Sequence, residues 1–262
     1  MSRVAVVTGG SSGIGKSIAE GLFNSGWIVY ELSRSGVSTE GILHISTDIS
    51  KEEQVRAAFA EIYAAEGSIN LLVNNAGMGI SGAVEYTETE SAKRLFDVNF
   101  FGSFICAREA IAYLRRSENP QIINISSVAA IFSIPYQSFY SASKAAINSL
   151  TLTLANELKS FGIRVNGVMP GDVKTGFTAA REKSEDGKEL YGGAISRAVG
   201  VMEKDETTGM PPEKVAQLVL KISHGRASGK LYVAGGKYKL FVFLGRLLPT
   251  SLANRLVGSM YK

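Results

Sequence analysis

The sequence is poor in the residues that hold folds together by covalent bonds or metal ions. Its 262 residues include one cysteine, Cys106, which excludes a disulfide within the chain and favours a reducing compartment. The two histidines, His44 and His224, lie far apart and lack the spacing of metal ligands. We therefore expect no metal site.

Long apolar runs and dense charge are also missing. No stretch has the length of a transmembrane helix, and the apolar run at 4–7 is too short for a signal peptide. The net charge of +4 is mild and there is no dense basic run, so nucleic acid is not an expected partner. These absences favour a cytoplasmic protein.

What is present fits one large α/β domain. Apolar segments predict strands at 4–7, 27–32, 43–45, 69–73, 120–127 and 163–169. Helical patterns lie between them, at 14–24, from an N-cap at Ser50 onward, at 88–116 and at 138–160. The alternation predicts a single doubly wound Rossmann-type domain, with a mostly parallel sheet of about seven strands and helices on both faces.

A glycine-rich turn follows the first strand. Gly9 allows a tight turn, Gly13 lets the backbone approach a ligand, and Gly15 lets the next helix pack closely. The free N–H groups at the start of that helix suit a pyrophosphate. The spacing is G-x-x-x-G-x-G rather than the commoner G-x-G-x-x-G. Any tight connection needs glycine, but the flanking strand and helix favour nucleotide binding.

The end of the second strand indicates which nucleotide is bound. An acidic residue there would accept a hydrogen bond from a free ribose 2′-OH, whereas Arg34 beside Ser33 suits a 2′-phosphate. Arg34 could also be a solvated loop charge, and Glu31, two positions before Ser33, should point elsewhere. The pattern favours NADP, with NAD as the alternative.

Tyr140 and Lys144 lie four positions apart, on one side of a predicted helix. A positive charge near a phenol favours the phenolate. Lowering its pKa from about 10 by roughly three units needs about 4 kcal/mol. A lysine in a closed site beside a cationic cofactor could supply this. Alone, the pair could also be a surface helix contact.

Other polar residues join this pair at the ends of the predicted strands. In a parallel sheet those ends share one edge, where such sheets bind ligands. The strand ends are Thr8, Ser33, Asp48, Asn74, Ser127 and Pro170.

Together these motifs resemble the short-chain dehydrogenase/reductase family, in its compact single-domain branch, over about residues 3–236. Ser127 precedes Tyr140 by thirteen positions, which is usual for that family. The other motifs are the glycine turn, Asn74-Asn75-Ala76-Gly77, Asn99, Tyr140-x-x-x-Lys144 and Pro170-Gly171-x-Val173-x-Thr175.

The resemblance implies a catalytic tetrad of Asn99, Ser127, Tyr140 and Lys144. Hydride passes between the nicotinamide and a carbonyl or secondary alcohol, while Tyr140 exchanges the proton and Ser127 holds the oxygen. Lys144 lowers the pKa of the tyrosine and holds the ribose, and Asn99 holds a backbone opening and a water. Alternatively, Asn99 only caps a helix irregularity and Asn74 only stabilises the central strands.

The same resemblance implies the cofactor contacts, with Asp48 and Ile49 at the adenine and Val173 and Thr175 near the carboxamide. Ser12 departs from many NADP-using relatives, which carry a basic residue there, so Arg34 is the main discriminator. The full set is Gly9, Ser11, Ser12, Gly13, Ile14, Gly15, Ser33, Arg34, Asp48, Ile49, Asn75, Ala76, Gly77, Tyr140, Lys144, Pro170, Gly171, Val173 and Thr175.

Two segments extend the catalytic domain, which we place at 1–236. Residues 176–210 are rich in glycine and charge and predict a substrate lid, with an ordinary surface excursion as the alternative. The apolar loop 128–137 predicts a pocket wall and a hydrophobic substrate. Residues 237–262 form an apolar, basic tail, similar to that of steroid- and retinoid-acting relatives, which favours a lipophilic substrate.

Three roles for this tail remain open. Packing on its own domain or over the substrate mouth is preferred, and a subunit interface is second. Reversible contact with a membrane surface is disfavoured, because basic charge is present but sparse.

The expected function is hydride transfer between NADP(H) and a small-molecule carbonyl or alcohol, of steroid, retinoid or fatty-acyl kind. A 3-oxoacyl-carrier-protein-type reductase and a catalytically silent NADP(H)-sensing protein are the alternatives. The helices at 88–116 and 138–160 resemble those that pair subunits in relatives, which implies a homodimer or homotetramer.

Overall fold

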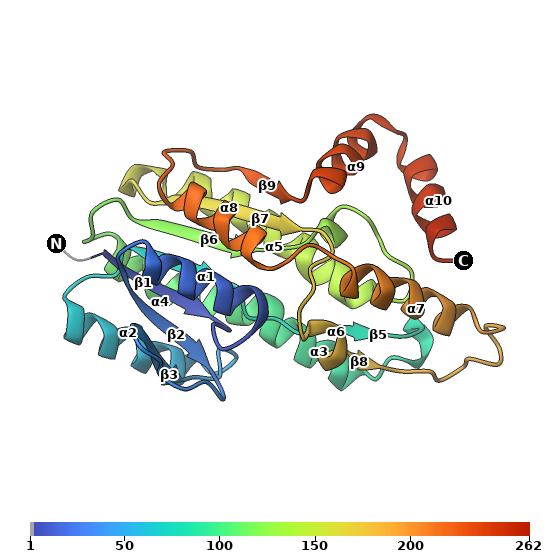
Figure 1. Ribbon diagram of the computed structural model, residues 1–262, viewed down its shortest axis with the longest axis horizontal. Helices are drawn as coiled ribbons and strands as arrows, with labels where there is room; N and C mark the ends of the chain where they lie inside the picture. Colours follow the sequence, from blue (N-terminus) through green and yellow to red (C-terminus); the bar gives the residue numbers. More distant parts are fainter. Residues whose placement is uncertain (1–2) are drawn as a thin grey trace.

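The computed structural model describes residues 3–262 and is built around a seven-stranded, fully parallel sheet, in agreement with the predicted fold class (Figure 1). The strand order is β3-β2-β1-β4-β6-β7-β9. These strands are β1 Arg3–Thr8, β2 Trp27–Ser33, β3 Ile42–Ser46, β4 Leu71–Asn74, β6 Gln121–Ile125, β7 Arg164–Pro170 and β9 Leu231–Ala234. A separate parallel pair joins β5 Ile80–Ser81 to β8 Glu182–Lys183.

Helices cover both faces of the sheet. One core cluster lies under α1 and α8, and the other under α2, α4 and α5. The helices are α1 Gly13–Asn24, α2 Glu52–Glu66, α3 Thr89–Phe96, α4 Ser103–Leu114, α5 Ser138–Glu157, α6 Phe177–Ala180, α7 Ala194–Thr207, α8 Glu213–Ser223, α9 Gly236–Leu247 and α10 Thr250–Met260. Three 3₁₀ turns are η1 Val84–Tyr86, η3 Val128–Ala130 and η4 Lys159–Phe161, and η2 Asp97–Gly102 is a π-helix.

β1 shows why the strand sequences are apolar throughout. Val4 and Val6 enter one core cluster, whereas Ala5 and Val7 enter the other, and all four are fully buried. Alternate residues of a strand point to opposite faces, so a strand covered on both faces needs an apolar side chain at every position.

The order of the strands fixes where a ligand can bind. β1 pairs with β2 on one side and with β4 on the other, so the winding direction reverses between β1 and β4. All seven strands run parallel, and their carboxyl ends share one edge. In open α/β sheets, ligands bind at that edge, at the point of reversal.

Two helix predictions need correction. Ser50 does not cap α2, because the helix begins at Glu52 and Lys51 occupies the cap position without a side-chain cap bond. The Ser50 hydroxyl instead donates to Asp48 Oδ1 at 2.7 Å. Glu52 and Glu53 lie in the first turn, as expected. The region expected as one helix at 88–116 is divided into α3, η2 and α4.

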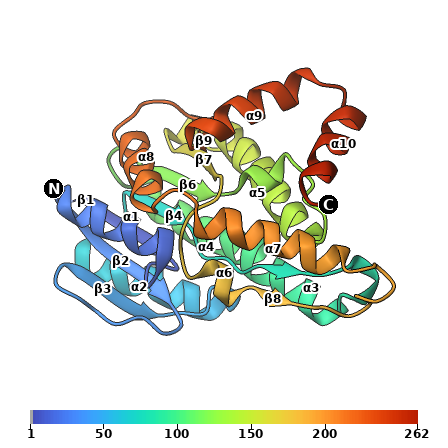
Figure 2. The ribbon, with the colours of Figure 1, turned by 45° about the vertical axis from the view of Figure 1, so that its right-hand side comes forward.

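Beyond β9 the chain leaves the sheet. α9 and α10 stand out from the edge of the domain in both views (Figures 1 and 2). Within residues 3–262 we find no helix with the length and apolar character needed to cross a membrane.

Candidate active site

The turn after β1 adopts the geometry expected of a phosphate cradle. Gly9 and Gly13 have φ values of +65° and +52°, a region that favours glycine. A Cβ on Gly15 would lie 2.1 Å from the carbonyl oxygen of Gly9 and 2.4 Å from Nδ2 of Asn75. These positions therefore tolerate no side chain.

The start of α1 suits an anionic ligand. Its cap residue, Ser12, makes no side-chain hydrogen bond to the helix, and the first turn contains no acidic residue. The first N–H groups of a helix have no partner inside it and carry partial positive charge. Together with the glycine cradle, this open helix start fits the pyrophosphate of a dinucleotide cofactor.

Short polar side chains tie the end of β4 to the end of β1. Thr8 Oγ1 accepts hydrogen bonds from the backbone N–H groups of Asn75 and Ala76, each at 3.0 Å. Asn75 Nδ2 in turn donates to the carbonyl oxygens of Thr8 and Gly9, at 3.0 and 3.2 Å. The cradle is thus fixed from two neighbouring strands.

Asn74 belongs to a second, fully buried amide network. Its Nδ2 donates to Asn124 Oδ1 at 2.9 Å and to the Ser103 carbonyl at 3.1 Å. Asn124 then donates to Thr151 of α5 at 2.8 Å. These bonds link β4 to β6, α4 and α5, in keeping with the structural role considered for Asn74.

Of the two charged side chains near the end of β2, Glu31 is buried and Arg34 is exposed, as the sequence suggested. Glu31 is buried and pairs with His44, and it accepts a hydrogen bond from the Ser33 hydroxyl at 3.2 Å. Arg34 is exposed. The carboxylate therefore points inward, while the guanidinium is free to meet a phosphate.

Asp48 lies in the same area. Burial alone would raise the pKa of its carboxyl, but hydrogen bonds from Ser50, together with the charges of Arg34 and Lys51, lower this pKa overall. The ionised Asp48 therefore lies in the field of Arg34, where the adenosine end of a cofactor would bind. Ile49, next to it, is buried against Gly102.

The segment after β7 reaches back to the glycine cradle. The side chain of Thr175 lies 3.3 Å from where a Cβ of Gly13 would be, and its Oγ1 accepts the Phe177 N–H at 3.3 Å. Val173 is buried and forms a β-bridge with Met210. This segment thus adjoins the cradle that the first strand provides.

Tyr140, Lys144 and Ser127 come together at the carboxyl end of β6. Lys144 Nζ lies 5.8 Å from the centre of the Tyr140 ring and donates to the Ile125 carbonyl at 3.0 Å. Ser127 is the cap of η3 and accepts the Ala129 N–H at 3.1 Å. The predicted phenol, ammonium and hydroxyl therefore face one space.

Burial is the largest influence on the charge of these groups. It lowers the pKa of the Lys144 ammonium to about 8. It also raises the pKa of the Tyr140 phenol to about 12, which a hydrogen bond from Ser127 partly offsets. The lowering of the tyrosine pKa by Lys144 beside a bound cofactor stays a prediction.

Asn99 explains the interruption of the expected long helix. Its Oδ1 accepts the Met78 N–H at 2.8 Å, and its Nδ2 donates to the Met78 carbonyl at 3.0 Å and to Ser143 Oγ at 3.1 Å. These bonds hold Asn99 within the π-helix η2. Such insertions often occur at functional sites. Asn99 joins the segment after β4 to α5, near Lys144.

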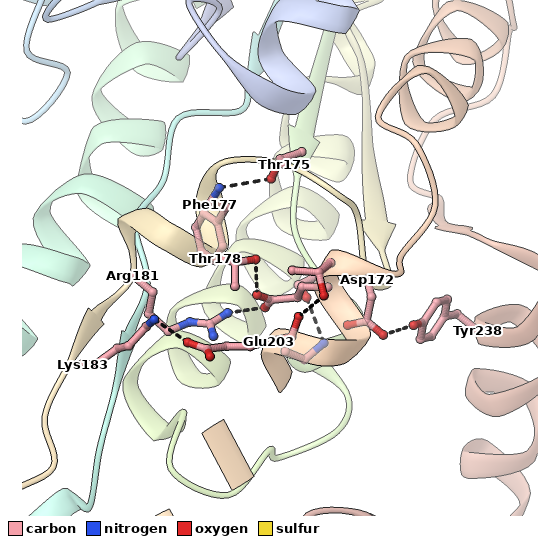
Figure 3. Close-up of polar contacts among 12 residues, drawn as sticks. Asp172, Thr175, Phe177, Thr178, Arg181, Lys183, Glu203 and Tyr238 are labelled. Atoms are coloured by element: carbon pink, nitrogen blue, oxygen red, sulfur yellow. Dashed lines mark hydrogen bonds and ion pairs between the residues drawn. The ribbon is translucent and has the colours of Figure 1, made fainter. Parts of the chain in front are cut away.

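The substrate side contains a charged cluster that the sequence did not reveal. Arg181 is fully buried and pairs with Glu206 of α7, which also accepts a hydrogen bond from Thr178 at 2.6 Å. The Phe177 ring lies 5.7 Å from the Arg181 guanidinium (Figure 3). The same ring lies 5.7 Å from the Tyr140 ring.

A second contact ties the tail to the segment after β7. The Tyr238 hydroxyl donates to Asp172, as Figure 3 shows, and Lys237 Nζ lies 3.8 Å from the same carboxylate. A Cβ on Gly171 would lie 2.0 Å from the Tyr238 ring. α9 therefore packs directly on the Pro170-Gly171 motif.

These charged groups influence the pKa of the Tyr140 phenol. Glu206 and Asp172 raise this pKa, whereas Arg181 lowers it. The motifs gave no signal for the charged residues, because the paired residues lie 25 and 66 positions apart in the sequence.

An open cleft of 280 Å³ lies beyond the phenol, between α3 and β8. Tyr136 from the predicted pocket wall lines it, together with Ser138 and Glu182. Neither Tyr140 nor Ser127 lines this cleft, so the cleft lies beside the predicted catalytic residues and does not contain them. Within residues 3–262, no group of three His, Cys, Asp or Glu side chains could hold a metal ion.

Comparison with known proteins agrees with this geometry. Residues 3–186 match the family model described as short chain dehydrogenase. The chain is 38% identical over 223 residues to a 3-ketodihydrosphingosine reductase of Bacteroides thetaiotaomicron, which covers 84% of this chain and 83% of the relative.

Two solved structures are also similar. A short-chain dehydrogenase from Streptomyces avermitilis has a TM-score of 0.83 and 30% identity, and the match covers 98% of this chain and 95% of that one. ElxO with NADP bound has a TM-score of 0.76 and 26% identity, and the match covers 92% and 100%. The chain therefore belongs to the short-chain dehydrogenase/reductase family and is an NAD(P)-dependent oxidoreductase.

Proposed function

We propose that the chain reduces a ketone on a long aliphatic molecule with NADPH, and that Tyr140 supplies the proton to the carbonyl oxygen. The observation that carries this proposal is the meeting of Tyr140, Ser127 and Lys144 beside an open phosphate cradle. The similarity to a 3-ketodihydrosphingosine reductase supports the choice of a lipophilic ketone.

The residues would divide the work in a simple way. Ser127 donates a hydrogen bond to the carbonyl oxygen, which lies within reach of the phenol. Lys144 holds the nicotinamide ribose and stabilises the phenolate that remains after proton transfer. Asn99 keeps the Met78 backbone in place and with it the opening beside Lys144. The bound cofactor supplies the hydride.

The preference for NADP rests on Arg34. Its guanidinium is exposed while the nearby carboxylate of Glu31 is paired with His44. A 2′-phosphate would therefore meet the positive charge of Arg34, while the Glu31 carboxylate is engaged by His44. The NADP-bound relative supports the same choice.

The charges near the phenol are mixed. Asp172 and Glu206 raise the pKa of Tyr140 and Arg181 lowers it, while Lys144 lies 5.8 Å from the ring and Lys237 lies 3.8 Å from Asp172. Because Glu206 pairs with Arg181 and Asp172 lies beside Lys237, these charges do not select among ketones. We propose a long-chain amino ketone ahead of a neutral ketone on the similarity to the 3-ketodihydrosphingosine reductase.

The remaining parts have supporting roles in this proposal. Residues 176–210 form the lid, on a catalytic domain of residues 1–236. A homodimer or homotetramer would form through η2, α4 and α5, which expose Phe101, Phe104 and Leu152, respectively.

A carbonyl panel tests the proposal. The purified chain would be incubated with NADPH or NADH and with long-chain ketones that differ only in an amino group beside the carbonyl, with steroid ketones and with a ketoacyl thioester. Nicotinamide absorbance then measures turnover. We expect the amino ketone with NADPH to be fastest.

The Tyr140→Phe variant tests the chemistry. It should lose about 10³-fold in turnover, because it has no proton to donate, while NADPH affinity stays unchanged. Tyr113→Phe, at a half-buried tyrosine packed against the core, is the control and should retain activity. NADPH binding without turnover of any carbonyl by the wild type would instead indicate a sensing protein.

A further inference from the structure

The last two helices expose an unusual amount of apolar surface. Within residues 3–262, seventeen large apolar side chains are exposed, and eight of them lie between residues 240 and 260. α10 buries no residue at all. The eight are Leu240, Phe241, Phe243, Leu244, Leu247, Leu252, Leu256 and Met260.

α9 has an inner and an outer side. Tyr238 and Val242 are buried in a small core cluster with Val128 and Met169, and Gly245 packs against Phe132. The outer side carries an apolar stripe at helical spacing, Leu240, Phe243, Leu244 and Leu247, and Leu247 is 67% exposed. The inner side therefore satisfies the preferred prediction for the tail, packing on its own domain, and leaves the outer stripe uncovered.

The charge of this segment points to what covers the stripe. Residues 237–262 contain no acidic residue and five exposed basic ones, which exceeds the net charge of +4 of the whole chain. The five are Lys237, Lys239, Arg246, Arg255 and Lys262.

We propose that α9 and α10 form a docking surface for an anionic phospholipid bilayer. The exposed leucines and phenylalanines would enter the boundary between headgroups and acyl chains, while the basic side chains would contact lipid phosphates. A helix of 12 residues is about 18 Å long, so α9 would lie in the plane of the interface without crossing it.

A second copy of the chain fits this surface less well. In a two-fold symmetric dimer, the same patch meets itself, so the basic residues of both copies would face each other across the contact. Like charges brought together in this way oppose association. The charge that repels a second copy attracts an anionic lipid surface.

The docking surface adjoins the active site. The inner side of α9 contacts the loop after Ser127 through Phe132, and the segment after β7 through Asp172. Burial, together with the negative charges of Asp172 and Glu206, raises the pKa of the Tyr261 phenol, just after α10, to about 12. A docked molecule would therefore hold its substrate mouth close to the bilayer, a consequence that rests on the proposed function, whereas docking itself does not.

Vesicle flotation of the full chain tests the docking surface. Vesicles of phosphatidylcholine with phosphatidylglycerol should bind the wild type, and vesicles of phosphatidylcholine alone should bind it weakly. The Phe243→Ser/Leu247→Ser variant should bind anionic vesicles at least about tenfold more weakly, because two exposed apolar anchors are lost. The matched control is Val37→Ser/Leu190→Ser, which removes two apolar side chains elsewhere that are at least as exposed.

Charge reversal separates the electrostatic part. Lys239→Glu/Arg246→Glu should abolish the preference for anionic vesicles, whereas Lys214→Glu/Lys221→Glu, the same change on α8, should preserve it. NADPH binding by each variant verifies that it is folded. The proposal fails if the wild type binds neither vesicle, or if the control variants lose binding equally. It also fails if the apolar tail variant lowers the oligomer mass in solution without lipid, which would assign the surface to a second copy.

Discussion

On its cofactor side, the site is fixed by backbone atoms and short side chains. The Thr8 hydroxyl accepts the backbone N–H of Asn75, and the Asn75 amide donates to the backbone carbonyl of Thr8. Gly15 lies too close to the Gly9 carbonyl to carry a side chain. On its substrate side, long side chains make the contacts, as in the Arg181–Glu206 ion pair and the Tyr238–Asp172 hydrogen bond.

This difference has a physical consequence. A site made of backbone atoms cannot accommodate an added carbon, because neither partner can move away. A site made of long side chains can rearrange around different ligands by changing rotamers. The cofactor side should therefore be intolerant of small changes, and the substrate side should tolerate them.

The largest expected effect comes from adding one methyl group on the cofactor side. Gly15→Ala would place Cβ 2.1 Å from the Gly9 carbonyl oxygen. We expect a loss of more than about 3 kcal/mol in the free energy of unfolding and a loss of NADPH binding, because the clash is with backbone. Urea unfolding and fluorescence titration with NADPH measure both.

The matched change on the lid is Gly200→Ala in α7, where a new Cβ would meet no atom within 4 Å. It should raise stability by about 0.5–1 kcal/mol through helix propensity and leave NADPH binding intact. Equal effects at the two glycines would remove the contrast between the two sides.

The second effect concerns Lys144, which lies where the two sides meet. Its folded pKa of about 8 is below the ordinary 10.5, so between these values the unfolded chain binds more protons than the folded one. The free energy of unfolding should therefore rise with pH, by roughly 3 kcal/mol over the full interval. Below pH 8 this gain is absent.

Cofactor-free Lys144→Met, measured by urea unfolding from pH 7 to 10, isolates this contribution. At pH 7 it should be more stable than the wild type, and the difference should shrink as pH rises. Lys16→Met, at an exposed site, should show no such trend. A difference independent of pH would mean that Lys144 is not buried as an uncompensated charge.

The smallest expected effect concerns the preference of the cofactor side for NADPH over NADH. Arg34→Asp should raise the Michaelis constant for NADPH at least about tenfold and leave that for NADH little changed, because the 2′-phosphate would lose its positive partner and meet a negative one. Steady-state kinetics with both cofactors decides it. An unchanged ratio of the two constants would remove Arg34 as the discriminator.

The strands and the cofactor cradle were predictable because their signals are local. Apolar runs such as 4–7 need no partner to be recognised, and Gly9, Gly13 and Gly15 lie within seven positions. The pairing of Tyr140 with Lys144 follows from one helical turn. The prediction of Ser50 as a cap was wrong because α2 begins one residue later than expected, with Lys51 at the cap position.

Six of the seven strands, the glycine cradle and the Tyr140–Lys144 pair could be read from the sequence, since each is a short run or a spacing of a few residues; β9 was not among the predicted segments. Only the tertiary structure placed Glu31 against His44, paired Arg181 with Glu206 and set Tyr238 on the Pro170-Gly171 motif. It also decided the charge of the site, because burial raises the pKa of Tyr140 and lowers that of Lys144. Burial and distant pairing are properties of packed elements, and no short stretch of sequence contains them.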